Sequence, residues 1–147
     1  MTTADRLDIT VNVRASDPAR SSDLYASAFG LEPIAGPVRF FDSATVFHSA
    51  EFDLDNGCIT YNFVASHGDD EDFRLWSFVP IVSRDLDGAM ARAVQAGLLK
   101  QRDVGVVDKV MPGLRHGLLS DPDDNPVVLL AEADLKRVLV RSSEAAG

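Results

Sequence analysis

The sequence is short of cysteine, of basic residues and of long apolar runs, and each shortage excludes a class of protein. Its 147 residues include one cysteine, Cys58, which forms no internal disulfide and fits a reducing compartment. Its 14 Lys and Arg face 23 Asp and Glu, and the net charge of -9 argues against nucleic acid or an anionic membrane as partner. No apolar run reaches the roughly 18 residues of a membrane-spanning helix. Residues 1–8 lack the features of a secretory signal, so we expect a cytoplasmic protein.

A strand followed by a capped helix organises the first half of the chain. Residues 9–15 alternate between apolar and polar with the period of a strand that has one buried face. Asp17 and Pro18 then supply an N-cap and a first helical residue, and Gly30 supplies a left-handed helix end. The stripe of this helix that faces the core is expected to comprise Ala19, Leu24, Tyr25, Ala26 and Phe29.

The same design recurs in the second half. Asp85 stands 68 positions after Asp17, follows a predicted strand at 77–83 and caps a second helix that ends at Gly97. Its expected core-facing stripe is Leu86, Ala89, Met90, Ala93 and Val94. Two copies of one unit at such a spacing indicate a duplicated module.

The remaining segments complete two β-α-β-β-β modules in one α+β domain. Between Gly30 and Ala50 we expect a short strand and a loop. Further strands are expected at 51–55 and 58–65 around the hairpin turn Asn56-Gly57, at 100–109, and at 114–120 and 126–132 around the turn 121–125. Module one then covers about 6–65, a polar linker about 66–73, module two about 74–132, and a short C-terminal helix about 133–141.

Three short motifs give the chain a family resemblance. They are Asp17-(x)7-Tyr25 with Phe29-Gly30-Leu31, Asp85-Leu86-Asp87 through Ala96-Gly97, and the turn DPDDN at 121–125. In these motifs and their order the sequence resembles the vicinal oxygen chelate superfamily of glyoxalases, bleomycin-resistance proteins and extradiol dioxygenases. The resemblance implies two modules whose curled mixed sheets surround a cavity, in a chain that forms a homodimer. Asp124 stands where the family turn has Gly, and Asp tolerates a left-handed backbone.

The resemblance also defines where a metal would bind. Metal-dependent members hold a divalent ion with His and Glu side chains from the strands that line the cavity. The matching positions here carry Thr10, Phe78 and Val128, and no carboxylate lies near Asn62, in residues 57–67. We therefore expect no metal and no other cofactor. His48 or His116 remains a candidate for an unusual metal site, while His67 falls in the polar linker.

Strand parity sorts the residues that would line the cavity. In each strand, every second residue packs under the helix, and the residues between them lie on the opposite face of the sheet. These opposite-face residues are polar in module one and apolar in module two. Aromatic and Met residues in the loops are candidates for the rim. The candidate ligand-binding residues are Thr10, Asn12, Arg14, Phe41, His48, Thr60, Asn62, Trp76, Phe78, Met111 and Val128. The alternative is that the polar ones form a satisfied structural network and the apolar ones fill a closed core.

Two functions remain open. The first is a metal-free small-molecule-binding protein that resembles bleomycin-resistance proteins and sequesters an aromatic or cationic organic ligand in a cavity of a dimer. The second is a glyoxalase- or dioxygenase-like enzyme that acts on a small oxygenated substrate. No catalytic residue is assigned, because Arg115 and His116 are adjacent in a strand and point to opposite faces, and Cys58 has no evident activating base.

Overall fold

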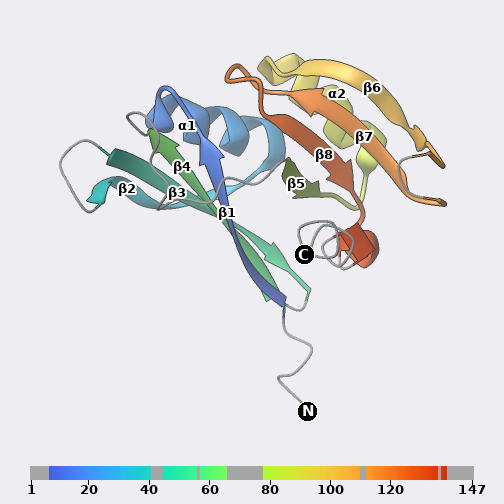
Figure 1. The fold of residues 1–147 in the computed structure, drawn as a ribbon, viewed down its shortest axis with the longest axis horizontal. Helices are drawn as coiled ribbons and strands as arrows, with labels where there is room; N and C mark the ends of the chain where they lie inside the picture. Colours follow the sequence, from blue (N-terminus) through green and yellow to red (C-terminus); the bar gives the residue numbers. More distant parts are fainter. Residues whose placement is uncertain are drawn as a thin grey trace, which may run out of the picture. The chain divides into compact units, whose positions relative to one another are not determined.

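A computed structural model describes residues 7–40, 45–55, 57–65, 78–109, 112–135 and 137–138. The chain divides into two compact units, residues 1–77 and 78–147, and each contains the same succession of elements (Figure 1). The first unit has β1 (Leu7–Arg14), α1 (Pro18–Phe29), β2 (Glu32–Phe40), β3 (Thr45–Leu54) and β4 (Gly57–Ala65). The second has β5 (Val79–Val82), α2 (Leu86–Ala96), β6 (Leu99–Val106), β7 (Arg115–Ser120) and β8 (Pro126–Leu130).

The two units also share one sheet topology. The strand order is β1-β4-β3-β2 in the first sheet and β5-β8-β7-β6 in the second. In each sheet the strand before the helix pairs in parallel with the last strand, and the other neighbours pair antiparallel. The predicted α+β fold of two β-α-β-β-β modules with mixed sheets is therefore confirmed.

Both helices begin and end at the residues that the sequence predicts. Asp17 accepts a hydrogen bond from the Arg20 amide at 3.2 Å, and Asp85 accepts one from the Gly88 amide at 3.0 Å. Each bond satisfies a backbone donor that the first helical turn cannot pair. α1 ends at Gly30, whose φ of 73° lies in the left-handed region that glycine adopts without a steric penalty.

The buried stripes of the helices differ in part from the predicted ones. α1 buries Pro18, Ser21, Ser22, Tyr25 and Ala28, whereas Ala19 is exposed. In α2 the predicted stripe is buried except for Val94, which is 43% exposed. Apolar periodicity was therefore a correct guide to the centre of each stripe and a wrong guide to its edges, because the twisted sheet beneath decides how far round the helix contact extends.

Several strand ends also differ from the prediction. β2 is nine residues long instead of short, with two register shifts against β3. β3 begins at Thr45, within the stretch expected to hold a short strand and a loop. β6 and β8 end three and two residues earlier than predicted. Residues 132–135 and 137–138 are helical, in agreement with the start of the predicted C-terminal helix, while the linker 66–73 lies outside the described residues.

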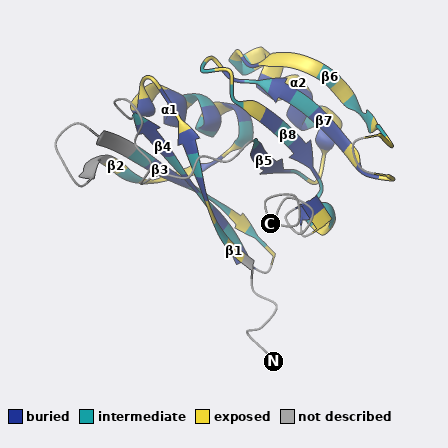
Figure 2. Ribbon diagram, in the orientation of Figure 1, coloured by how far each residue is buried: buried dark blue, intermediate teal, exposed yellow. Residues whose placement is uncertain are grey.

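Each sheet has one face that packs against its helix (Figure 2). In the first unit α1 contacts β2, β3 and β4, and the Tyr25 ring lies 5.0 Å from the Phe63 ring. Tyr61 is completely buried, and burial raises the pKa of its phenol far above the ordinary value, because the charged form loses its water. In the second unit α2 contacts β6, β7 and β8. The opposite face carries Thr10, Asn12, Arg14, Thr60 and Asn62 in the first sheet and Val128 in the second.

Candidate functional site

A hydrogen-bonded polar row crosses the face of the first sheet that lies opposite α1. Asn12, Asn62 and Ser49 are register partners on β1, β4 and β3. Asn62 Nδ2 donates to Asn12 Oδ1 at 3.1 Å, and the Ser49 hydroxyl donates to Asn62 Oδ1 at 2.6 Å. Ser49 is 5% exposed and the two Asn side chains are half-buried. Asn12, Asn62 and Ser49 are called the polar row below.

Other hydrophilic side chains flank the polar row on the same face. Thr10 and Thr60 are partners one row away, and Glu51 is the partner of Thr60 on β3. Arg14 lies one row away on the other side and is exposed. Because residues two apart along a strand share a face, five of the candidate residues lie on one face of the first sheet: Thr10, Asn12, Arg14, Thr60 and Asn62.

The equivalent row of the second sheet is apolar. Pro80, Val128 and Leu118 are register partners on β5, β8 and β7, and they take the places that Asn12, Asn62 and Ser49 take in the first unit. Val128 and Leu118 are half-buried, and Pro80 is buried. Phe78, two residues before Pro80, is half-buried as well.

A charged residue lies at the edge of this apolar row. Arg102 on β6 is the register partner of Leu118, and its Nη2 lies 2.5 Å from Nε2 of His116, a β7 residue that is 2% exposed. Because a guanidinium only donates, His116 Nε2 is the acceptor. His116 Nδ1 therefore carries the ring proton and donates to the Leu114 carbonyl at 3.0 Å. His116 is thus a neutral hydrogen-bond acceptor for Arg102.

The structure does not bring all the candidate residues together. His48 pairs with Phe63 on the α1 side of the first sheet, since the alternation of β3 turns Ser49 and not His48 toward the polar face. Phe41, Trp76, Met111 and His67 lie outside the described residues. The sequence analysis missed two contributors. Ser49 falls in a stretch for which only a short strand and a loop were expected, without a register. Arg102 reaches its face through register shifts in β6 that no sequence periodicity marks.

Arg115 and His116 do point to opposite faces, as strand alternation predicts. Arg115 Nη2 forms an ion pair with Asp87 Oδ2 at 2.9 Å, and Asp87 belongs to α2. His116 lies on the other side, with Arg102. The adjacent pair therefore forms no joint acid-base site.

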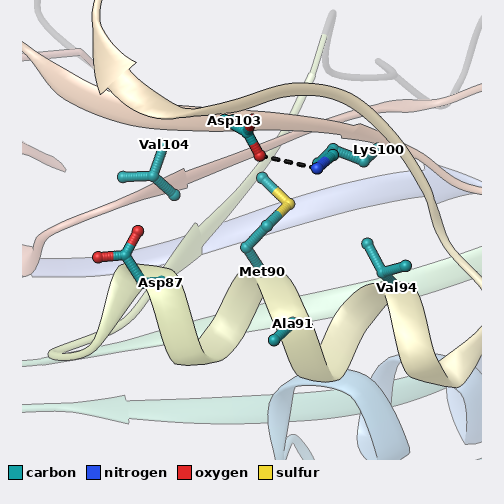
Figure 3. Close-up of a pocket in the computed structure, with 7 residues that line it drawn as sticks. All are labelled: Asp87, Met90, Ala91, Val94, Lys100, Asp103 and Val104. Carbon is teal, nitrogen blue, oxygen red and sulfur yellow. Dashed lines mark ion pairs between the residues drawn. The ribbon is translucent and has the colours of Figure 1, made fainter.

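A surface hollow of about 360 Å³ lies between α2 and β6, on the helix side of the second sheet (Figure 3). It is lined by Asp87, Met90, Ala91, Val94, Lys100, Asp103 and Val104. Lys100 and Asp103 pair with each other at 2.8 Å across its edge. Gly117 lies beneath, and a Cβ there would approach Met90 Cε to 2.6 Å. None of the predicted ligand-binding residues lines this hollow.

Within the described ranges, no group of three or more His, Cys, Asp or Glu side chains is arranged to hold a metal ion. Nor is any helix in that part of the chain long and apolar enough to cross a membrane.

Comparison with solved structures gives close similarities of fold. The chain is similar to a glyoxalase/bleomycin resistance protein from a Streptomyces species, with a TM-score of 0.60 and 17% identity over 84% of this chain and 99% of that one. A member of the glyoxalase/bleomycin resistance protein/dioxygenase superfamily from Sphaerobacter thermophilus gives a TM-score of 0.64 and 17% identity over 88% and 99%. Glyoxalase I from Zea mays gives a TM-score of 0.61 and 19% identity over 88% of this chain, and the match spans 47% of the glyoxalase chain. The sequence matches no family model, and no curated protein matches it.

Proposed function

Because the chain has the fold of the vicinal oxygen chelate superfamily, we propose that it is a metal-free protein that binds and sequesters a small organic molecule. The polar row carries this proposal. Amide and hydroxyl groups are held in fixed positions by each other at 2.6 and 3.1 Å, on a sheet face that the helix does not cover. A few placed polar groups beside apolar surface are the usual lining of a small-molecule site.

The metal-free part of the proposal is supported by residue chemistry. The positions that match the usual ligands of the superfamily carry Thr10, Phe78 and Val128, of which the last two have no donor atom for a metal. The fourth position falls at Asn62, whose amide oxygen already accepts the Ser49 hydroxyl. This residue set suits hydrogen bonding and apolar contact better than Lewis-acid chemistry.

The uncovered faces of the two sheets suit different chemical groups. In the first sheet Glu51 shares a face with the polar row, which suits a cationic group. In the second sheet the row of Pro80, Val128 and Leu118 suits an apolar or aromatic group. We also propose that the protein forms a homodimer, as the family resemblance implies, and that it sequesters the ligand in a cavity.

The first experiment measures the metal content of the purified protein and the thermal shift on adding Zn²⁺, Ni²⁺, Mn²⁺ or Fe²⁺. We expect no stoichiometric metal and no shift. A ligand present at about 100 times its dissociation constant stabilises the native state by about 2.7 kcal/mol, so a real metal site is detectable. Bound metal with a clear shift contradicts the proposal and favours the enzyme.

The second experiment locates organic ligands. Tyramine, an aromatic cation, is titrated into ¹⁵N-labelled protein while the side-chain amide signals of Asn12 and Asn62 are followed. Saturable shifts of these two signals are expected. Asn125 is the matched internal control, because its side-chain amide donates to Asp121 at 2.9 Å within a turn. Equal shifts of all three amides would count against the proposal. So would a panel of aromatic and cationic compounds of which none binds saturably.

A further inference from the structure

Among the described residues, no counter-ion balances the charge of Arg102. Within the described part of the chain, Arg102 takes part in no ion pair, and its guanidinium donates to the neutral ring of His116. His116 is itself fixed by the Leu114 carbonyl, so this acceptor brings no negative charge. An arginine stays protonated at every physiological pH. The described residues therefore hold this half-buried cation on the sheet without balancing its charge.

Arg102 also has an unused donor. Its Nε is buried and has no hydrogen-bond partner among the described residues, and it is the one buried side-chain nitrogen or oxygen there of which this is true. Buried polar groups in native proteins nearly always have a partner, so an orphan needs an explanation. A group that supplies both an acceptor and negative charge would satisfy the hydrogen bond and the charge together.

The described residues leave room for such a group beside Arg102 and His116. Gly105 is the register partner of His116, and a Cβ placed on Gly105 would meet no described atom within 4 Å. The register shift between Arg102 and Gly105 bends β6 at this point. Next to Arg102 the row continues with Leu118 and Val128, which are half-buried and apolar.

The charge is specific to the second unit. The residue that takes the place of Arg102 in the first unit is Ala35, the register partner of Ser49 on β2. The duplicated design therefore does not require a charged side chain at this position. The positive charge at this position therefore points to a role other than maintaining the fold.

We propose that Arg102 anchors an oxyanion-binding site on the face of the second sheet opposite α2. Its ligand is a small molecule with a carboxylate or phosphate group joined to an apolar body. The oxyanion accepts from the guanidinium, whose planar fork matches such groups, and the apolar body lies along Leu118 and Val128. His116 is a positioning residue that holds the guanidinium. This site goes beyond the function proposed above, because it adds an anionic ligand to the apolar row of the second sheet, while the polar row that carries that proposal lies in the first unit.

The test uses the whole chain and follows the Arg102 Nε–H signal by ¹⁵N NMR while benzoate, phenyl phosphate or the neutral analogue benzamide is added. Benzoate or phenyl phosphate is expected to shift this signal saturably, and whichever acts at the lower concentration identifies the oxyanion. Benzamide is expected to have no effect. Equal shifts with sodium chloride at matched ionic strength mean a nonspecific ion effect and overturn the proposal, as does the absence of any shift.

Two variants locate the site. Arg102→Gln is expected to weaken binding by about tenfold or more, because it removes a charged hydrogen bond. Arg115→Gln is the matched control, since Arg115 is exposed on the other face and paired with Asp87, and it is expected to leave affinity unchanged. Undiminished affinity in Arg102→Gln overturns the proposal; if that variant does not fold, the signal in the unsubstituted protein decides. Binding of tyramine at Asn12 and Asn62 is read separately, so the failure of one site does not imply failure of the other.

Discussion

Removing Asn62 from the polar row tests whether the row is a coupled hydrogen-bond network. Asn62→Ala removes both of its bonds, at 2.6 Å from Ser49 and 3.1 Å to Asn12. It leaves the hydroxyl of Ser49, a residue that is 5% exposed, without this acceptor. A typical hydrogen bond contributes about 0.5–1.5 kcal/mol net, and an unsatisfied buried group costs about 1–3 kcal/mol. We therefore expect Asn62→Ala to lower the free energy of unfolding by about 2–3 kcal/mol.

A double-mutant cycle with Ser49 isolates the coupling. Ser49→Ala alone is expected to lose about 1 kcal/mol, since Asn62 is half-buried and water can replace the lost donor. The double variant then loses less than the sum of the single variants by about 1 kcal/mol. The assay is urea unfolding followed by circular dichroism, with unchanged m-values as the sign that the unfolded state is the same. Thr60→Ala, on the same face one row away, is the control and should cost less than about 1 kcal/mol. Additivity of Ser49→Ala and Asn62→Ala within about 0.5 kcal/mol would refute the network.

Three further predictions concern other positions. Gly117→Ala is expected to lower the free energy of unfolding in urea by only about 1 kcal/mol, because the flexible end of Met90 can move into the adjacent hollow. The branched side chain of Gly117→Val should cost about 3 kcal/mol. Equal losses in the two variants would contradict this reasoning. Burial raises the pKa of Tyr61, so its contribution to stability is present below a pH of about 10 and is lost above it as the unfolded phenol ionises. Tyr61→Phe should therefore move the alkaline unfolding midpoint, read by circular dichroism, to higher pH. Asp124 has a φ of 64°, so in thermal unfolding Asp124→Gly should be neutral or stabilising by up to about 1 kcal/mol and Asp124→Val destabilising by about 1–2 kcal/mol.

The two sheets of this chain show how one duplicated design can present opposite surfaces. The same register position holds Asn62 in the first sheet and Val128 in the second. The first row satisfies its polar atoms internally through Ser49, while the second ends in an arginine whose Nε has no acceptor in the described part of the chain. The chemistry of each sheet face is therefore set by single positions on a backbone plan that both units share.

The sequence by itself determined the elements and their order. Caps are local chemistry, so Asp17, Gly30 and Asp85 marked the helix ends without help from the rest of the chain. Alternation in residues 9–15 and 58–65 predicted the face on which Asn12 and Asn62 lie, because strand periodicity is a property of the backbone alone. The left-handed Asp124 was expected from its place in the DPDDN turn and is observed.

Only the tertiary structure decided which strands are neighbours and in what register. Ser49 reaches Asn62 because β3 pairs with β4 at one particular offset, and a shift of one residue would have turned His48 toward the polar face instead. Arg102 meets His116 because β6 contains register shifts, which leave no periodic trace in the sequence. Both pairings depend on long-range contacts between strands, which the local preferences of a chain do not specify.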